Sequence, residues 1–440
     1  MNHPQLPAWS YNDYHRQLAR QTLEKALNHV PFYQERKKYD PGESWPVEKR
    51  YAALPVLTKK DIRENFPAGM LPPDMDLNRA LQSREINLVE TSGTTDEKIT
   101  NIWNQNWWDA AERGSWQLHS VMSLNTTGQH PEAILVNPKN VGVKSDEVDL
   151  PMEQRRLGRY LYLNEKTDPL TWSSSLMERM IDELNQFQPV VLEANPSYLA
   201  RLSRYIASRP GKVFQPKAIV FTYEYPASFH LRQIAACFKS PLISSYGTTE
   251  TGYVFMQCEE GLLHQNSDFC QVDFQPFKAQ YGGPLLGRIL VTPLGNPWCY
   301  YLHFDTGDMV EIESRGACRC GRSSGMILKA IAGRKVNLTL TPEGRPVTLL
   351  ELDNALSVLD DIYEYQFVQT GLSEYNLLLT GENLYKSNPG QKAAAILRNI
   401  YGLKARINII YTDSITPEVS GKYLLSKALF PINLEPYLDS

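Results

Sequence analysis

Ser244-Ser245-Tyr246-Gly247-Thr248-Thr249-Glu250-Thr251-Gly252 is the stretch around which the rest of the chain can be organised. It follows the short apolar run 241–243, which predicts the end of a buried strand. Glycine lets a backbone approach a ligand closely, threonine hydroxyls and free backbone N–H groups can donate to phosphate oxygens, and Glu250 can bind Mg²⁺ through oxygen. The stretch therefore favours a nucleotide phosphate site, although a turn leading into an ordinary capped element would have the same composition.

Strand-like and helix-like segments alternate from about residue 130 to residue 245, at the spacing of βαβ units. This order predicts a mostly parallel sheet with helices on its faces. Ligands of such sheets lie beyond the carboxyl ends of the strands, and the loops 91–95, 222–224 and 246–250 each follow a predicted strand. We therefore expect these loops to meet at one site. The predicted strands are 133–136, 189–193, 217–221 and 241–244, and the predicted helices are 176–187, 196–207 and 226–238.

Beyond Gly252 short strands punctuated by glycine and proline predict a β-rich subdomain. Asp305-Thr306-Gly307-Asp308 is expected as a tight turn between two of these strands. Residues 338–440 alternate strand and helix over a short span, as in a small α+β lobe. The predicted fold is thus α/β, with a large N-terminal domain over residues 1–333 and a small α+β domain over residues 334–440.

Composition limits the classes of function. The chain has 440 residues, of which 42% are hydrophobic and 21% charged, and its net charge of −4 offers no basic field for nucleic acid. No run of eighteen apolar residues occurs, so we expect no membrane span, and the start Met1-Asn2-His3-Pro4 lacks the order of a signal peptide. Six cysteines in a chain of this length favour the reducing cytoplasm, where clustered cysteines more often bind metal than form disulfides.

A metal site is indicated by Cys318-Arg319-Cys320, a close pair of thiols on a predicted turn, together with the earlier Cys258 and His264. Three thiolates and one imidazole complete a tetrahedral zinc site and leave no position open for substrate, so its role would be structural. Cys270 could replace His264 in this set. The alternative is that Cys258 and His264 are unconnected core or surface residues.

Five short motifs follow one another along the chain: Thr91-Ser92-Gly93-Thr94-Thr95, Tyr246-Gly247-Thr248-Thr249-Glu250, Asp305-Thr306-Gly307-Asp308, Gly333-Arg334 and Ser420-Gly421-Lys422. In this order and spacing they resemble the motifs of adenylate-forming enzymes. The chain is more particularly similar to the phenylacetate–coenzyme A ligase branch, through the segments 27–33 and 55–59 and through the cysteine and histidine set, which resembles a zinc site of some members. The resemblance covers nearly the whole chain.

The resemblance implies an ATP-dependent ligase that activates a carboxylic acid, an aryl acid in this branch, as acyl-AMP and transfers it to coenzyme A. The C-terminal domain would then be a mobile lid that carries the catalytic lysine. A close alternative keeps the adenylation but passes the acyl or aminoacyl group to a separate carrier protein or to an amine. A distant alternative is a non-catalytic, zinc-stapled relative, against which the presence of both Glu250 and Lys422 argues. As partners we expect a small-molecule carboxylic acid, with an acyl-carrier protein or a second copy of the chain as further candidates, and neither nucleic acid nor membrane.

Roles for individual residues follow from the same resemblance. Lys422, Glu250 and Thr249 would be catalytic, with Glu250 holding Mg²⁺ and Lys422 stabilising charge as the acid and the α-phosphate join. The acid pocket would involve Glu193, Ala194, Asn195 and Tyr198. A buried Glu193 would select an amine-bearing acid, whereas a surface or helix-capping role for it is the ordinary alternative. ATP or AMP would be bound by Ser92, Gly93, Thr94, Thr95, Tyr223, Glu224, Tyr246, Gly247, Thr248, Asp308 and Arg334, and zinc by Cys258, His264, Cys318 and Cys320.

Two segments depart from the pattern of the family. The phosphate loop commonly continues Gly-Lys-Pro, whereas Asp96-Glu97-Lys98 stand here. An Asp pair usually follows the arginine at the hinge, whereas Lys335-Val336-Asn337 follow Arg334. The contacts of the loop with ATP and those of the hinge with coenzyme A are therefore expected to differ from the family's.

Overall fold

The computed structural model describes residues 6–91, 98–138, 150–382, 384, 388–418 and 422–439. The chain forms two compact units, each built from separate stretches of sequence. The first unit consists of Met1–Ser123, Ser245–Ala330 and Leu438–Ser440, and the second of Leu124–Ser244 and Ile331–Tyr437. The fold is mixed α/β, as predicted. No helix of the described stretches combines the length and the apolar character that crossing a membrane requires.

Helices at the start of the first unit follow their capping signals closely. The Asn12 side chain caps α1 (Asp13–His29), and Pro31 begins α2 (Pro31–Gln34), so the proline ends one helix and starts the next. Thr58 and Asp61 form a capping box at the start of α4 (Lys59–Asn65). The other helices here are α3 (Val47–Ala52), α5 (Leu77–Gln82), α6 (Gln105–Trp116) and α7 (Ser120–Asn125), whose last residues enter the second unit.

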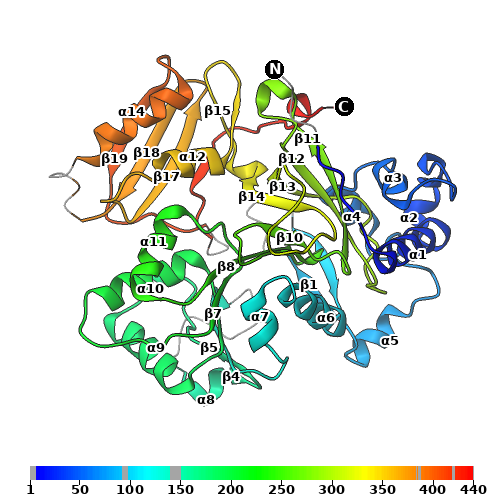
Figure 1. The fold of residues 1–440 in the computed structure, drawn as a ribbon, viewed down its shortest axis with the longest axis horizontal. Helices are drawn as coiled ribbons and strands as arrows, with labels where there is room; N and C mark the ends of the chain where they lie inside the picture. Colours follow the sequence, from blue (N-terminus) through cyan, green and yellow to red (C-terminus); the bar gives the residue numbers. More distant parts are fainter. Residues whose placement is uncertain are drawn as a thin grey trace. The chain divides into compact units, whose positions relative to one another are not determined.

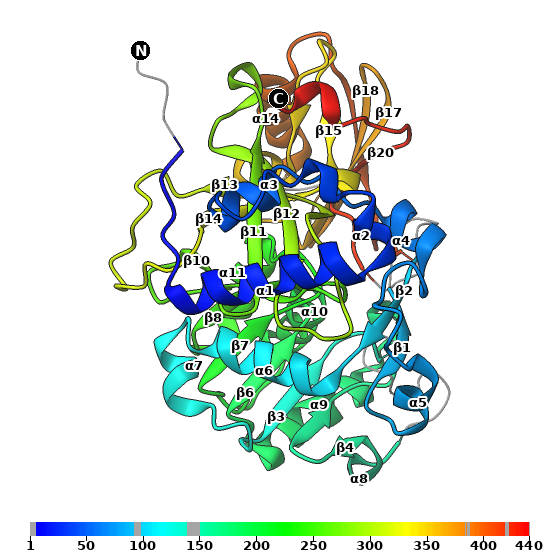
Figure 2. The ribbon, with the colours of Figure 1, turned by 90° about the vertical axis from the view of Figure 1, so that its right-hand side faces the viewer.

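An antiparallel sheet forms the centre of the first unit, in the strand order β11-β12-β13-β14-β10-β9-β8. Figure 2 shows α1 running in front of β11 and β12, and His15 of α1 hydrogen-bonds Gln271 of β11 through Nε2 at 2.9 Å. A separate hairpin pairs β1 with β2. The strands are β1 (Asn87–Glu90), β2 (Thr100–Trp103), β8 (Leu242–Thr248), β9 (Gly252–Gln257), β10 (Leu263–Gln265), β11 (Cys270–Pro276), β12 (Leu286–Pro293), β13 (Phe304–Ile312) and β14 (Ile327–Arg334).

One predicted turn and the first part of one predicted loop proved wrong, because both lie within strands. Asp305-Thr306-Gly307-Asp308 is part of β13, where Gly307 has φ +75° and its N–H donates to Asp305 Oδ1 at 2.8 Å. Tyr246 and Gly247 belong to β8, which continues to Thr248 before the chain turns. In both places the pairing shifts register without breaking, so glycine and aspartate mark an irregular strand instead of a loop.

The second unit contains the predicted parallel sheet. β3 (Glu132–Leu135), β5 (Tyr160–Tyr162), β6 (Val191–Ala194), β7 (Ala218–Phe221) and the first residues of β8 pair in parallel. Helices α9 (Ser174–Phe187), α10 (Pro196–Ala207) and α11 (Ser228–Cys237) lie to one side of these strands in Figure 1 and share one apolar core with them. The unit also has α8 (Met152–Arg155) and the short edge strand β4 (Arg156–Leu157).

The C-terminal residues form the predicted α+β lobe within the second unit. Its four-stranded sheet has the order β19-β18-β17-β20 and packs with α12 (Leu349–Leu356) and α14 (Pro389–Tyr401), both seen beside it in Figure 1. A short two-stranded ribbon pairs β15 with β16. The strands are β15 (Thr339–Leu340), β16 (Pro346–Val347), β17 (Glu364–Gly371), β18 (Glu374–Thr380), β19 (Arg406–Tyr411) and β20 (Ser426–Ala428). The lobe begins at Ile331, close to the predicted domain boundary at residue 333. Residues 124–244, however, belong to the same compact unit as the lobe. That the lobe is a mobile lid stays a prediction.

Candidate functional site

Residues predicted to bind the nucleotide occur in both units. Ser92, Gly93, Thr94 and Thr95 lie outside the described residues, as do Ser420 and Gly421. In the first unit the structure describes Tyr246, Gly247, Thr248, Thr249, Glu250 and Asp308, and in the second Tyr223, Glu224, Arg334 and Lys422.

Tyr246 and Asp308 face each other across the first unit's sheet. The Tyr246 hydroxyl donates to Asp308 Oδ2 at 2.8 Å and lies 3.2 Å from Thr306 Oγ1. Asp308 is buried, with 4% of its surface exposed, so a polar partner for its carboxylate is needed. The sequence predicted a base-stacking tyrosine and a ribose-binding aspartate, and the structure places the two side chains in contact.

Glu250 is buried at the turn that follows β8, with 6% exposure. Its Oε1 lies 3.4 Å from the ammonium of Lys59, the first residue of α4. The preceding Thr249 is anchored through its backbone oxygen, which accepts from Asn101 Nδ2 at 2.6 Å. The carboxylate predicted to hold Mg²⁺ is therefore fixed in a buried position beside one lysine.

Lys59 was not predicted as a site residue. A local signal in the sequence indicates where Lys59 lies in its helix, because the Thr58–Asp61 capping box fixes the start of α4 and thereby the direction of the Lys59 side chain. Its contact with Glu250 joins residues far apart in the chain, and nothing in the sequence alone indicates that pairing.

Gly247 has a structural reason to be glycine. A Cβ on it would lie 2.3 Å from the backbone oxygen of Gly252 in the neighbouring strand β9. Thr248 is used in the turn itself, since its Oγ1 lies 2.9 Å from Thr251 Oγ1 and accepts from the Thr251 N–H at 3.2 Å. These two predicted nucleotide contacts thus have roles in shaping the turn.

Glu224 joins three segments of the second unit. Its carboxylate accepts from the Ser197 hydroxyl at the start of α10, and its Oε1 accepts from the Tyr423 N–H at 3.0 Å. Burial raises the pKa of Glu224 to about 7, while the Ser197 and Tyr423 hydrogen bonds and the nearby Lys422 charge act in the opposite direction. The predicted catalytic Lys422 is consequently held next to a carboxylate 198 positions earlier in the chain.

Tyr223 has φ +70°, a backbone conformation that is uncommon outside glycine. Its side chain hydrogen-bonds with Glu193, one of the residues predicted for the acid pocket, whereas Tyr223 itself was predicted as a nucleotide contact. Arg334 begins the short 3-10 helix η5 (Lys335–Asn337), and its N–H donates to Asn337 Oδ1 at 3.2 Å. Asn337 at this position therefore organises the backbone at the predicted hinge.

The four residues predicted for the acid pocket divide between the two faces of the parallel sheet. Ala194 and Tyr198 belong to the apolar core formed with α9, α10 and α11, and the Tyr198 hydroxyl donates to the Thr167 backbone oxygen. Glu193 lies on the opposite face, and Asn195 follows it by two residues in an extended backbone, which directs both side chains to the same side. The structure therefore keeps Glu193 and Asn195 together and separates them from the other two.

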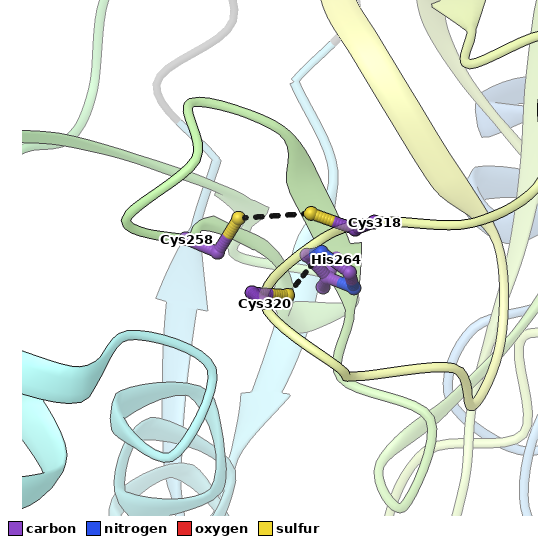
Figure 3. Close-up of side chains that lie close together, drawn as sticks. All are labelled: Cys258, His264, Cys318 and Cys320. Atoms are coloured by element: carbon purple, nitrogen blue, oxygen red, sulfur yellow. Dashed lines mark hydrogen bonds between the residues drawn. The ribbon is translucent and has the colours of Figure 1, made fainter.

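Cys258, His264, Cys318 and Cys320 come together in the first unit, as Figure 3 shows. The ligand atoms of all four lie within 4.8 Å of one another, with 3.7 Å between the sulfurs of Cys258 and Cys318 and 3.3 Å from Cys320 Sγ to His264 Nε2. Tetrahedral zinc, with bonds of about 2.3 Å to sulfur and about 2.1 Å to nitrogen, separates its ligands by roughly 3.5–3.8 Å. The cluster fits zinc in both chemistry and spacing.

The state of His264 agrees with that fit. Burial lowers the pKa of His264 to about 4, so its imidazole is neutral at pH 7, as a metal ligand must be. Cys270, the predicted substitute for His264, lies elsewhere, with its sulfur 3.4 Å from the Asn266 backbone oxygen. Cys237 and Cys299 are likewise outside the cluster.

Comparison with known structures defines the fold class. The structure of 2-hydroxyisobutyryl-CoA ligase in the postadenylation state, in complex with R3-HIB-AMP, matches with a TM-score of 0.67 at 16% identity, over 94% of this chain and 88% of that one. An open conformation of the same ligase with 2-HIB-AMP and CoA matches with a TM-score of 0.55 at 15% identity, over 94% and 90%. This chain has the fold of the adenylate-forming acyl-CoA ligases.

Comparison of the sequence with known proteins finds a more distant kind of likeness. Protein CapK of Staphylococcus aureus is 22% identical over 379 residues, which cover 84% of this chain and 78% of CapK. No family model matches the chain. At these identities the likeness establishes the fold alone.

Proposed function

We propose that this protein is an ATP-dependent ligase that activates a carboxylic acid. A carboxylate is a poor acyl donor because its leaving group would be oxide. Attack of the carboxylate on the α-phosphate of ATP forms acyl-AMP and releases pyrophosphate, and a thiol then displaces AMP to give a thioester. The protein contributes to this reaction mainly by aligning the reactants and neutralising their charges, and less by covalent chemistry.

The observation that carries this proposal is the buried Glu250 beside Lys59 at the turn after β8. A buried carboxylate next to one lysine suits a site where a divalent cation and phosphate oxygens are bound together. Glu250 would hold Mg²⁺, which keeps several waters and phosphate oxygens as its other ligands and supplies positive charge at the phosphates. Because Mg²⁺ would then neutralise the Glu250 carboxylate, the Lys59 ammonium could pair with a phosphate oxygen instead.

In the second unit we assign charge stabilisation during adenylation to Lys422, whose ammonium is near Glu224 in this structure. The fold supports this assignment through a ligase that has been seen with an acyl-AMP and with CoA. For the acceptor we propose coenzyme A, and a separate carrier protein or an amine is the alternative. The aryl nature of the acid rests on the resemblance of the sequence motifs to the phenylacetate–coenzyme A ligase branch.

We further propose that Cys258, His264, Cys318 and Cys320 hold one structural zinc ion. All four positions of a tetrahedral site are filled by protein ligands, which is typical of a structural site and not a catalytic one. Bound zinc would join the loop between β13 and β14 to the β9–β10 hairpin, where short elements alone supply little packing.

Pyrophosphate exchange into ATP tests the adenylation. The wild-type protein should catalyse exchange with one class of carboxylic acid in a panel of aryl, aliphatic and amino acids. Glu250→Gln should lower the exchange rate by at least 100-fold, since it removes the charge that holds the metal, without a change in unfolding temperature. The matched control is Glu64→Gln in α4, an exposed carboxylate paired only with Lys60, which should leave exchange unaltered. Exchange at the wild-type rate in Glu250→Gln would contradict the assignment.

A further inference from the structure

One face of the parallel sheet in the second unit carries two buried carboxylates, those of Glu132 and Glu193. Strand registers pair Glu132 with Tyr160, Ile134 with Tyr162, Ile134 with Glu193, and Glu193 with Val220, so these side chains lie on one face. The opposite face forms the apolar core with α9, α10 and α11. Parallel strands covered on both sides are normally apolar throughout, so two carboxylates on this face need an explanation.

The charges on this face do not balance within the described part of the unit. Arg159 donates to Glu132 at 2.5 Å, and His130 Nε2 lies 3.4 Å from the same carboxylate oxygen. Glu193 is 8% exposed and has no ion pair with any described lysine, arginine or histidine. Its Oε1 accepts from Thr222 Oγ1 at 3.0 Å, and the Tyr223 and Glu132 side chains also hydrogen-bond with it, but none of these partners supplies a positive charge. A buried carboxylate without a counter-ion is costly unless it takes up a proton or a cation.

A second and independent feature lies two residues further on. Asn195 is fully buried, and neither its Oδ1 nor its Nδ2 has a hydrogen-bond partner among the described residues. Asparagine at the N-cap position of a helix usually caps it, but here Asn195 makes no such bond. Glu224 accepts from Ser197 at the start of α10 instead, which leaves the Asn195 amide free. A buried amide with both atoms unused indicates that a polar group from a ligand completes the site.

Glu193 and Asn195 are at the carboxyl end of β6, and Thr222 follows the end of β7. Ligands of parallel sheets bind at this end of the strands. A carboxylate that lacks a cation, an amide oxygen that lacks a donor and the half-buried phenol of Tyr162 are the groups that recognise a protonated amine, by charge, hydrogen bond and cation–π contact.

We propose that the carboxylic acid activated by this protein carries an ammonium group, which Glu193 and Asn195 bind at the carboxyl end of β6. This inference rests on the proposed adenylation, and it names the substrate class of that reaction. The pKa of Glu193, raised by burial and by Glu132 to about 7, agrees with a site that holds a proton until a cation replaces it.

Matched pairs of acids test the inference at pH 8, where Glu193 is ionised and aliphatic amines are protonated. Suitable pairs are β-alanine with propanoate, 4-aminobutanoate with butanoate, phenylalanine with 3-phenylpropanoate, and 4-(aminomethyl)benzoate with 4-methylbenzoate. In at least one pair, the kcat/KM for pyrophosphate exchange should be on the order of 100-fold higher with the amine-bearing acid than with its amine-free partner. An acid without the ammonium group would leave the buried polar groups of the site unpaired.

Glu193→Gln is the decisive variant. Glutamine has the shape of the protonated side chain and can keep the Thr222 contact, so the variant should fold. It should raise KM for the amine-bearing acid by about 30- to 100-fold while kcat changes little. It should not lower kcat/KM for the amine-free partner. The matched control is Glu178→Gln in α9, where the carboxylate pairs with Arg209 away from this face.

Calorimetric binding of the same acids, without ATP, separates this inference from the proposed function. Binding of an amine-bearing acid that Glu193→Gln weakens at least tenfold, without any exchange, would uphold the amine site and reject the ligase. Exchange with amine-free acids at rates equal to or above those of their amine-bearing partners would reject the amine site and uphold the ligase. An equal affinity of the wild type and Glu193→Gln for the amine-bearing acids, or no binding of any of them, would also overturn the inference.

Discussion

Glu193, Glu224 and Glu250 show how one residue type takes three roles through its surroundings. Glu250 has a lysine partner, Glu224 accepts from the start of a helix and from a backbone N–H, and Glu193 has hydrogen bonds but no cation among its described neighbours. Burial sets the cost of each charge, and the partner decides how that cost is met. The residue without a cation is therefore the one we assign to a ligand cation.

The proton on Glu193 makes stability depend on pH. Its pKa in the folded chain is about 7, above its ordinary value of 4.5, so between these pH values the folded chain retains a proton that the unfolded chain has lost. The free energy of unfolding should consequently fall as pH rises from 5 to 8. Glutamine cannot titrate, so Glu193→Gln should lose less stability over that range, by up to about 3 kcal/mol.

Urea unfolding of ligand-free protein at pH 5 and pH 8 measures this difference. Glu224 and Asp273, whose pKa values burial also raises to about 7, act in the same direction in both proteins and cancel in the comparison. Glu132, Tyr162 and Tyr223 lie near Glu193 and are likewise common to both. Parallel changes in the two proteins would show that Glu193 has an ordinary pKa.

At the scale of elements, the loop between β13 and β14 depends on its cysteines. It makes no strand or helix, and Gly316, Gly321 and Gly325 have positive φ angles, so its backbone has little regular hydrogen bonding of its own. Zinc bound by Cys318 and Cys320 would fix this loop against Cys258 and His264.

Metal analysis by mass spectrometry should find about one zinc per chain. Cys318→Ser should lose the metal and lower the unfolding temperature by several degrees, because a structural zinc ion contributes directly to folding free energy. Cys237→Ser is the matched control, since that thiol lies outside the cluster, and it should retain zinc. A wild-type protein that is folded and free of metal would refute the zinc site.

Elements with local signals could be predicted from the sequence, and elements fixed by distant contacts could not. Residues 196–207 were predicted as a helix and form α10, because Pro196 at its first position and the apolar spacing act locally. β5 was missed, since Tyr160–Tyr162 is a short strand that owes its place to pairing with β3. The turn predicted at residues 305–308 was wrong because a register shift in a strand uses the same residue types as a turn.

The candidate site shows the same division. The cysteine and histidine set could be named from residue type and spacing, since zinc demands particular ligands. The contacts of Lys59 with Glu250 and of Glu224 with Tyr423 depend on how separate segments fold together, and no local pattern encodes them. The sequence likewise could not tell that Ala194 and Tyr198 face the apolar core while Glu193 and Asn195 face away from it.

At the scale of the whole molecule, the two units are built from interleaved parts of the chain, and the residues assigned to the nucleotide occur in both. The fold matches a ligase that has been seen with an acyl-AMP. We propose that Lys422 acts in forming the acyl-AMP, because it would offset repulsion between two anions as they join, and that it contributes less to holding ATP.

Single-turnover detection of acyl-AMP by mass spectrometry tests this role of Lys422. Enzyme in excess over ATP, with an activating acid and no thiol, should convert ATP to acyl-AMP and pyrophosphate. Lys422→Ala should reduce the rate of acyl-AMP formation by at least 100-fold while the affinity for ATP changes less than about fivefold, and Lys404→Ala, an exposed lysine paired with Glu343, should behave as wild type. The absence of acyl-AMP from the wild-type reaction with every acid, or an equal loss of ATP binding and adenylation in Lys422→Ala, would contradict the account.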